Sequence, residues 1–183
     1  EWVAYPSMIG VERFRIYENG SVDGTAELLA SLARRYPIEI VPWPNQPANL
    51  TAFQDGIVAE LGRSNWLACI DADEFLVPAE GDDLRVLLRR VPEEVAALVL
   101  NWRIFGSSGL EKRPSGTTLE SYRRRASDDF WPNRHIKSIV RPRQAILTFT
   151  THEFLTLGPQ VNARLEQVTP LAGQLGTPCF DGA

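Results

Sequence analysis

Apolar and polar positions switch between strand-like and helix-like spacing along the first half of the chain. Val11 to Glu18 alternates with a period of two, which predicts a strand, and apolar residues within 28–33 recur at helical spacing. Ile38 to Trp43 predicts a second strand, residues 50–61 a second helix, and Asn65 to Ile70 an apolar strand of the kind found buried in parallel sheets. The order strand, helix, strand, helix, strand predicts a parallel sheet with right-handed crossovers, whose ligands collect at the carboxyl ends of the strands.

The chain opens with a short predicted helix over Glu1 to Gly10, which we expect to turn three apolar side chains toward the core. Those side chains are Trp2, Val3 and Met8. Between the first strand and the next helix lies a turn-rich loop, Asn19 to Thr25. Within this loop Asp23 or Thr25 is a candidate cap for the helix.

The second half of the chain predicts fewer helices. A helix begins near Asp82, and Ala96 to Phe105 predicts another buried strand. Two further strands, His135 to Arg141 and Ala145 to Thr151, could pair antiparallel across the turn between them. Periodicity is weak from Gly158 onward, which predicts an irregular tail over 159–183.

Three carboxylates stand where the apolar strand ending at Ile70 leaves the core. The stretch reads Asp71-Ala72-Asp73-Glu74-Phe75. Residues two apart in an extended segment face the same side, so we expect Asp71 and Asp73 to converge. Converging carboxylates need a positive charge between them, and oxygen ligands on a loop suit Mg²⁺ or Mn²⁺ with substrate phosphates completing the shell. The stretch therefore predicts a site for a metal-bound phosphorylated ligand.

Composition narrows the function classes. The chain has 183 residues, 44% hydrophobic and 23% charged, which suits one globular domain. A net charge of -4 argues against a nucleic-acid partner. No apolar run approaches the roughly 20 residues that span a bilayer, so we expect no transmembrane segment and at most a peripheral membrane contact. Cys69 and Cys179 look like unpaired thiols of a reducing compartment, which predicts a cytoplasmic protein or one at the inner face of the membrane.

Four segments together resemble the family 2-like and family 92-like glycosyltransferases of the GT-A fold. They are Glu18-Asn19-Gly20-Ser21-Val22-Asp23-Gly24-Thr25, Trp66-Leu67-Ala68-Cys69-Ile70-Asp71-Ala72-Asp73-Glu74-Phe75-Leu76, Trp102-Arg103-Ile104-Phe105-Gly106-Ser107-Ser108-Gly109 and Lys137-Ser138-Ile139-Val140-Arg141-Pro142. The resemblance implies an α/β fold with a mostly parallel, Rossmann-like sheet flanked by helices and a short antiparallel acceptor-side portion. It places a GT-A-like domain over 1–158, with a nucleotide-binding part at 1–77 and an acceptor-side part at 95–158.

The resemblance also implies a nucleoside-diphosphate sugar as donor, a divalent metal, and transfer with inversion to a glycan or lipid-linked acceptor. By the family's pattern Asp73 binds the metal, and Asp71 contacts either the ribose or the metal. Glu18 would meet the nucleoside, with Asn19 and Asp23 beside it in the nucleotide-binding loop. His152, at the end of a predicted strand, is a weaker candidate for the metal.

An inverting transfer needs a carboxylate that takes the proton from the acceptor hydroxyl. Four residues are candidates for this base, and no motif selects among them. They are Glu74, Asp128, Asp129 and Glu153. Trp102 and Trp131 are candidates for a surface on which a sugar ring stacks.

Two departures from the family's pattern accompany the resemblance. Relatives begin with a strand before the opening helix, and without it we expect a central edge of the sheet either to lie open or to be covered by another segment. Relatives also carry a His-Tyr and Lys-Ser segment toward the C-terminus, which is not found after Gly158. The alternative function is therefore a degenerate GT-A module that binds nucleotide or glycan without catalysis.

Other readings of the acidic stretch fit less well. A phosphatase with an aspartate nucleophile normally has Thr or Val where Phe75 stands, and a calcium loop of the EF-hand type needs glycine where Leu76 stands. Without a ligand, Asp71 and Asp73 would be a polar strand end that caps the next turn. His135 fits an ordinary structural histidine.

Overall fold

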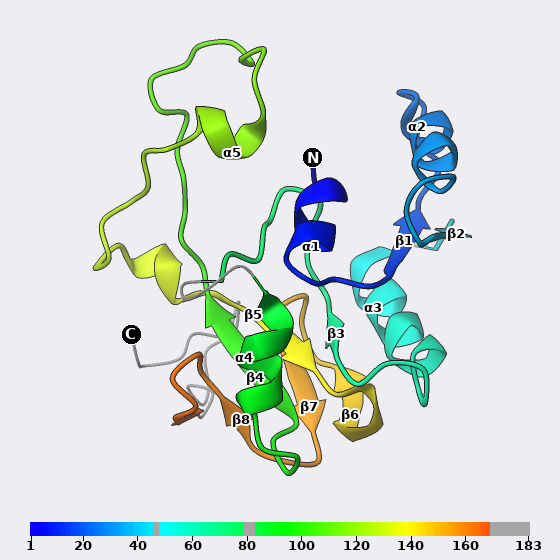
Figure 1. Cartoon of the computed structure of the whole chain (residues 1–183), viewed down its shortest axis with the longest axis vertical. Coiled ribbons are helices and arrows are strands. Elements are labelled where there is room, and N and C mark those ends of the chain that lie inside the picture. The colour runs from blue at the N-terminus through cyan, green and yellow to red at the C-terminus, as the bar shows by residue number, and fades with distance from the viewer. Residues whose placement is uncertain (46–47, 79–82, 169–183) are drawn as a thin grey trace.

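The computed structural model describes residues 1–45, 48–78 and 83–168, and Figure 1 shows helices and strands alternating in its first half. In chain order the elements are α1 (Ala4–Met8), β1 (Phe14–Glu18), α2 (Thr25–Leu32), β2 (Ile38–Pro42), α3 (Ala48–Ala59), β3 (Leu67–Ala68), α4 (Leu84–Arg90), β4 (Ala97–Asn101), α5 (Thr118–Ser121), η1 (Trp131–Arg134), β5 (Ile136–Val140), η2 (Pro142–Gln144), β6 (Ala145–Thr148), β7 (Phe154–Thr156), β8 (Gln160–Val161) and β9 (Gln167–Val168). The predicted order strand, helix, strand, helix, strand is therefore confirmed by β1, α2, β2, α3 and β3, although β3 is shorter than the predicted strand.

The strands form three sheets. β1 and β2 are a parallel pair, β6 and β7 an antiparallel pair, and the remaining strands make a five-stranded sheet in the order β3-β5-β4-β8-β9. In that larger sheet only β4 and β8 are parallel, while β3–β5, β4–β5 and β8–β9 are antiparallel. The fold is α/β, but the described sheets are mixed, so the prediction of a mostly parallel sheet is not met. The reason is that the chain comes back after residues 102–135 into β5, which lies beside β4 and runs antiparallel to it.

Alternate residues of β4 and β5 serve two apolar clusters on opposite faces of the larger sheet. Leu98 and Ile139 pack with α4, whereas Ala97 and Val140 pack with Ile57 of α3 and with the β6–β7 hairpin. This two-faced burial explains why β5 has no exposed residue. The sheet is thus covered by α4 on one face and by α3 and the hairpin on the other.

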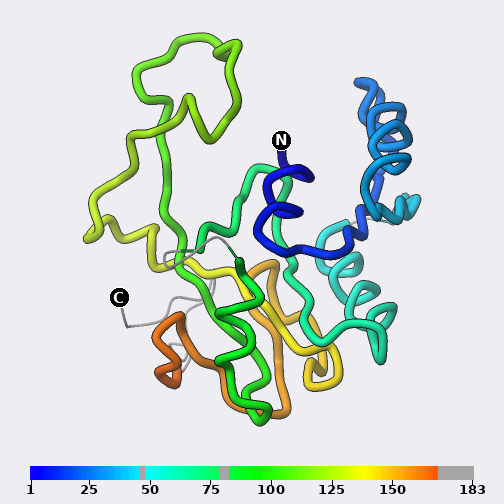
Figure 2. Tube along the Cα trace, in the orientation of Figure 1, coloured from blue at the N-terminus to red at the C-terminus, as the bar shows by residue number. Residues whose placement is uncertain are grey.

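A long arm, residues 102–135, leaves the sheet between β4 and β5 and carries α5 (Figure 1). At its base the Trp102 N–H donates to the His135 carbonyl at 2.8 Å. The buried Asn133 side chain accepts from the Ile104 N–H at 3.1 Å and donates to the Ser127 carbonyl at 2.8 Å. Figure 2 shows the arm extending well away from the strands.

Several predicted details differ from the structure. β6 pairs with β7 rather than with the strand before it, because η2 turns the chain out of the larger sheet. β8 and β9 lie within the stretch expected to be irregular, and residues 169–183, with Cys179, lie outside the described residues. Met8 is 80% exposed, while Ile9 takes the core position expected of it.

β1 and β3 are both edge strands. Among residues 1–45, 48–78 and 83–168, β1 pairs only with β2, and β3 pairs only with β5. The open central edge expected from the sequence is therefore present on both strands. None of the described helices is long and apolar enough to cross a membrane.

The chain passes too close to itself at Gly158 for any larger residue. A Cβ there would meet the backbone oxygen of Glu94 and come within 2.7 Å of Gln144 Oε1. We expect Gly158→Ala to lower the free energy of unfolding by about 1–3 kcal/mol, because the backbone of Glu94 must move. Denaturant unfolding measures this loss.

The matched control is Gly106→Ala, since a Cβ at Gly106 would meet nothing within 4 Å. That variant should stay within about 1 kcal/mol of the parent. Equal losses in both variants would contradict the steric account.

Candidate active site

The acidic stretch after β3 forms a turn. The Glu74 N–H donates to the Asp71 carbonyl at 3.1 Å, and the Asp71 N–H donates to Glu74 Oε2 at 3.0 Å. Asp73 is exposed at the tip of this turn. The expectation that the segment continues extended is therefore wrong, because the side chain of Glu74 folds back on the backbone of Asp71.

Trp2, in the N-terminal segment, forms hydrogen bonds with the backbone of the turn. Its Nε1–H donates to the carbonyls of Asp71 at 3.1 Å and Glu74 at 2.9 Å. Tyr5 of α1 contacts the ring of Phe75 edge-on, with centroids 6.0 Å apart. Trp2, just ahead of α1, and Tyr5 within it thus contact the acidic turn and the residue after it, a role that the sequence did not suggest.

Lys137, in the middle of β5, provides the positive charge that the carboxylates require. Its side chain is only 5% exposed, and Nζ lies 2.8 Å from Asp71 Oδ2 and 3.4 Å from Glu74 Oε2. Nζ also donates to the Thr151 carbonyl at 3.1 Å. One ammonium group therefore joins the acidic turn to the loop that carries His152. The signal in the sequence was a lysine within a short strand whose other residues are apolar except Ser138.

His152 reaches the same region from the β6–β7 hairpin. The Ser138 hydroxyl donates to the His152 carbonyl at 2.9 Å, and His152 Nδ1 lies 3.0 Å from the Ile136 carbonyl. A carbonyl can only accept, so Nδ1 carries a proton in this contact and Nε2 of a neutral ring is left as an acceptor. Burial lowers the pKa of His152, with the nearby Lys137 charge adding to the effect.

Aromatic rings continue from His152 toward the arm. Trp102 contacts both histidines edge-on, with centroid distances of 5.1 Å to His135 and 5.2 Å to His152. Trp131 contacts His135 at 5.3 Å and is 54% exposed. The two candidate stacking residues therefore belong to one cluster at the base of the arm.

The nucleotide-loop candidates lie at the end of β1 and bond mainly to their own loop. Glu18 accepts from the Gly20 N–H at 3.1 Å and the Ser21 N–H at 2.5 Å, and these bonds lower its pKa. Asp23 accepts from the Thr25 hydroxyl and from the Thr25 N–H, the first of α2, although the N-cap residue itself is Gly24 rather than either predicted residue. The Asn19 amide donates to the carbonyl of Trp43.

The structure separates the four candidate bases. Burial raises the pKa of Glu74, which lies in the acidic turn, and of Glu153, which is 8% exposed beside His152. Asp128 lies on the arm, where Arg125 at 2.5 Å lowers its pKa, and Asp129 is exposed next to it. Only Glu74 and Glu153 are therefore close to the residues around Lys137.

The acidic turn offers oxygen donors but no closed cage. Across the described ranges, no three side chains of His, Cys, Asp or Glu are grouped so that they could hold a metal ion by themselves. Mg²⁺ is usually held by one or two carboxylates together with substrate phosphates, and Asp71 with Asp73 matches that donor set. The residues therefore fit a metal whose remaining ligands come from a bound diphosphate and water.

Comparison with known proteins places this site in a family context. The sequence model of glycosyltransferase family 92 matches residues 1–175. A family 92 glycosyltransferase of rice (Oryza sativa subsp. japonica) is 34% identical over 145 residues, covering 78% of this chain and 24% of the relative. One of castor bean (Ricinus communis) is 33% identical over 160 residues, covering 84% and 28%, and one of Arabidopsis thaliana is 29% identical over 153 residues, covering 78% and 26%. The chain spans about a quarter of the length of these curated relatives.

Buried Glu153 gives the protein a pH-dependent stability. Its folded pKa is raised by burial, so the fold favours the protonated form, and stability is lost as pH rises through that folded pKa. We expect Glu153→Gln to unfold at higher denaturant concentration than the parent at pH 8, with the difference shrinking toward pH 4. Glu111→Gln, at an exposed glutamate, should show no such trend. A gap that widens toward low pH would contradict the assignment.

Proposed function

The chain belongs to glycosyltransferase family 92, and from this premise we propose that the protein transfers a sugar from a nucleoside-diphosphate sugar to a hydroxyl group of a glycan or lipid-linked acceptor. The family match over residues 1–175 is the observation that carries the proposal. The acidic turn at the end of β3, which faces the buried Lys137, is where we place the reaction.

The fold proposed for the full site is GT-A. The parallel pair β1–β2 and the helices α2 and α3 supply the nucleotide-binding half, and β3 ends at the acidic turn. Ligands in α/β sheets bind outside the carboxyl ends of the strands, which is where Glu18 and Asp71 stand.

Asp71 and Asp73 are the proposed holders of a divalent cation, Mn²⁺ or Mg²⁺. His152, the third candidate, is not grouped with them in the described structure as a third ligand of the same ion. Asp71 Oδ2 accepts a hydrogen bond from Lys137 Nζ, whereas Asp71 Oδ1 has no hydrogen bond or ion pair among the described residues. Asp73 is exposed and free to turn toward a ligand. When bound, the metal would neutralise the charge that builds up on the departing diphosphate.

Lys137 has a second proposed role, toward the diphosphate. Its ammonium is held by two carboxylates and a carbonyl, so it is already positioned and desolvated. Because these partners take its three N–H donors, Lys137 would act on a diphosphate through its charge rather than by a direct hydrogen bond. Lys137 would therefore orient the diphosphate against the acidic turn.

Glu74 is the proposed base for an inverting transfer. Its Oε2 is engaged by the Asp71 N–H and by Lys137, which fixes the carboxylate and leaves Oε1 to take the proton from the acceptor hydroxyl. The raised pKa of Glu74 makes it a stronger base than an ordinary exposed glutamate. The acceptor would approach along the arm, where the exposed Trp131 offers a face for a sugar ring.

Nucleotide binding gives the first test. We expect UDP or GDP to bind in calorimetric titration with Mn²⁺ present, and chelation of the metal to weaken binding at least tenfold. Asp73→Asn should cause a similar loss, because it removes one charged oxygen donor. Glu111→Gln, which makes the same change of charge on the exposed arm, should bind as the parent does.

The titration also separates the two candidate functions. Binding followed by release of nucleoside diphosphate from a panel of UDP- and GDP-sugars favours the enzyme. Nucleotide binding without sugar transfer, measured on the protein with any sequence that flanks these 183 residues, would favour the non-catalytic module. Equal binding by Asp73→Asn and the parent would remove the metal site from the acidic turn.

Substitution of the base tests the chemical step. We expect Glu74→Gln to lower kcat by about 10²–10⁴-fold while nucleotide binding stays within about threefold, because the amide keeps the shape but cannot accept a proton. In the parent, the apparent pKa of the acidic limb of the pH-rate profile should be higher than the pKa of an ordinary glutamate. In the variant this limb should disappear. Asp128→Asn, on the arm, should retain the parent's kcat. A larger loss with Asp128→Asn than with Glu74→Gln would reverse the assignment.

A further inference from the structure

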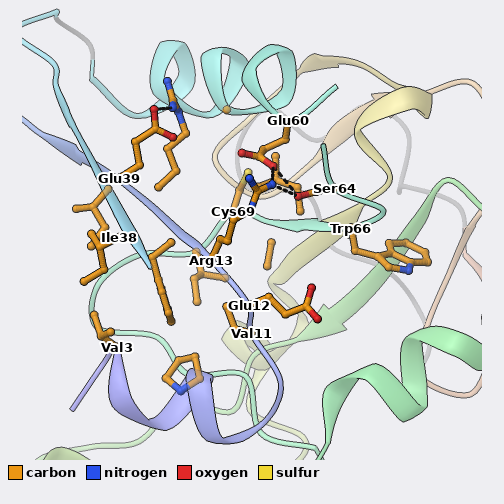
Figure 3. A pocket seen from close by; sticks show the side chains of 18 of the residues that line it. Val3, Val11, Glu12, Arg13, Ile38, Glu39, Glu60, Ser64, Trp66 and Cys69 are labelled. Carbon is orange, nitrogen blue, oxygen red and sulfur yellow. Dashed lines mark hydrogen bonds and ion pairs between the residues drawn. The ribbon is translucent and has the colours of Figure 1, made fainter. Parts of the chain in front are cut away.

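The acidic turn, residues 71–74, borders a cavity between β1 and β3. The cavity has a volume of about 1430 Å³, and Asp71 and Ala72 are among the residues that line it. Figure 3 shows Val3 of the N-terminal segment and Cys69 of the segment after β3 on its walls. Residues beside such a space have fewer packing partners than residues in a close-packed core. The turn therefore depends more on hydrogen bonds than on packing for its position.

The hydrogen bonds within the turn connect only its two ends. The Glu74 N–H donates to the Asp71 carbonyl at 3.1 Å, and the Asp71 N–H donates to Glu74 Oε2 at 3.0 Å. Segments with few buried contacts and a few local hydrogen bonds open at a low cost in free energy. Contacts from elsewhere in the chain are therefore needed to keep this turn in one conformation.

Two residues that are distant in the sequence supply those contacts. The Trp2 Nε1–H is shared between the carbonyls of Asp71 at 3.1 Å and Glu74 at 2.9 Å, which makes a three-centre hydrogen bond. Lys137 Nζ meets the carboxylates of the same two residues at 2.8 and 3.4 Å. Trp2 thus holds the backbone of the turn, while Lys137 holds its side chains.

An indole suits this position because its N–H donates and cannot accept. The Asp71 carbonyl accepts from both the Glu74 N–H and the Trp2 Nε1–H, so both of its lone pairs are used. Carbonyl oxygens bind hard cations as carboxylate oxygens do. The bond from Trp2 therefore leaves the carboxylates, rather than the backbone oxygen of Asp71, to meet a cation.

Trp2 is itself held from several directions. Its ring packs against Phe14 of β1, with centroids 6.1 Å apart, and the following residue, Val3, is only 5% exposed. The preceding residue, Glu1, accepts from two backbone N–H groups at the start of α5, at 2.6 and 2.9 Å. A side chain whose surroundings fix it can place its donor precisely.

We propose that Trp2 is a positioning residue, whose indole N–H keeps the acidic turn closed so that Asp71, Asp73 and Glu74 stay where the reaction needs them. The catalytic consequence rests on the proposed function, whereas the hold on the turn does not. Misplacement of a reacting group by about 1 Å can lower a rate by about 10²-fold. Loss of the indole N–H should therefore slow the reaction through the turn that it bonds.

Amide hydrogen exchange on the full chain tests the hold on the turn without any ligand. Trp2→Phe keeps an aromatic ring beside Phe14 and removes the N–H. We expect the amides of Asp71 and Glu74 to exchange about tenfold faster or more in this variant. The amide of the buried Ala96, which donates to the Pro159 carbonyl at 2.8 Å, should keep the parent's rate.

Two matched variants make the result specific. Replacement of Trp2 by benzothienylalanine, which has the shape of tryptophan but no ring N–H, should have the same effect even if Trp2→Phe folds poorly. Trp66→Phe makes the same substitution just ahead of β3, where the ring lies 3.9 Å from the Arg141 guanidinium and has no hydrogen bond to the turn among the described residues. This variant should leave the exchange of the turn amides unchanged.

Two exchange results would overturn the proposal. One is an exchange rate like that of the parent, at Asp71 and Glu74, in both replacements of Trp2. The other is an equal acceleration at Ala96, since Trp2 would then contribute only to global stability.

Kinetics test the catalytic consequence. With donor and metal saturating, we expect Trp2→Phe to lower kcat by about 10–100-fold and Trp66→Phe to stay within about threefold of the parent. A loss confined to KM would make Trp2 a residue of donor binding and overturn its positioning role. If the parent transfers no sugar, the proposed function fails, and the exchange experiment alone decides whether Trp2 holds the turn.

Discussion

The buried ammonium group of Lys137 is the constraint on which the candidate site depends. A lysine side chain that is 5% exposed is stable as a cation only if carboxylates and carbonyls surround it. Asp71, Glu74 and Thr151 meet that need, and they come from segments that are far apart in the sequence. Because β5 is buried on both faces, Lys137 cannot move far without opening the core. The position of the acidic turn is therefore set from the centre of the sheet.

The cavity between β1 and β3 and the candidate active site have wall residues in common. Asp71 and Ala72 line the cavity between β1 and β3, and Trp2, which bonds the acidic turn, lines it as well. Packing in this cavity and the position of the acidic turn are therefore linked through Trp2.

Sequence patterns predicted what depends on local spacing and missed what depends on distant contacts. The alternation of strands and helices as far as β3 followed from periodicity, and the bonds between Asp23 and Thr25 at the start of α2 followed from turn chemistry. The turn at Asp71 was missed although its bonds between Asp71 and Glu74 are local, and the indole that bonds both of its carbonyls comes from Trp2, about 70 residues away. Pairing of β6 with β7 was missed for a similar reason: η2 changes the direction of the chain after β5. Of the four candidate bases, only folding shows that Asp128 is neutralised on the arm.

The arm has a closed base, and this affects how the protein can diverge. Its two ends are joined by the hydrogen bond between Trp102 and His135 and by the side chain of Asn133. The geometry of the sheet therefore does not depend on the length of the arm beyond these contacts. Lengthening a loop whose ends are already fixed costs little conformational entropy. Insertions and deletions between Phe105 and Arg125 should therefore accumulate among homologues while β4 and β5 keep their register. The outer part of the arm could therefore change in length and sequence during evolution without any change in the packing of the core.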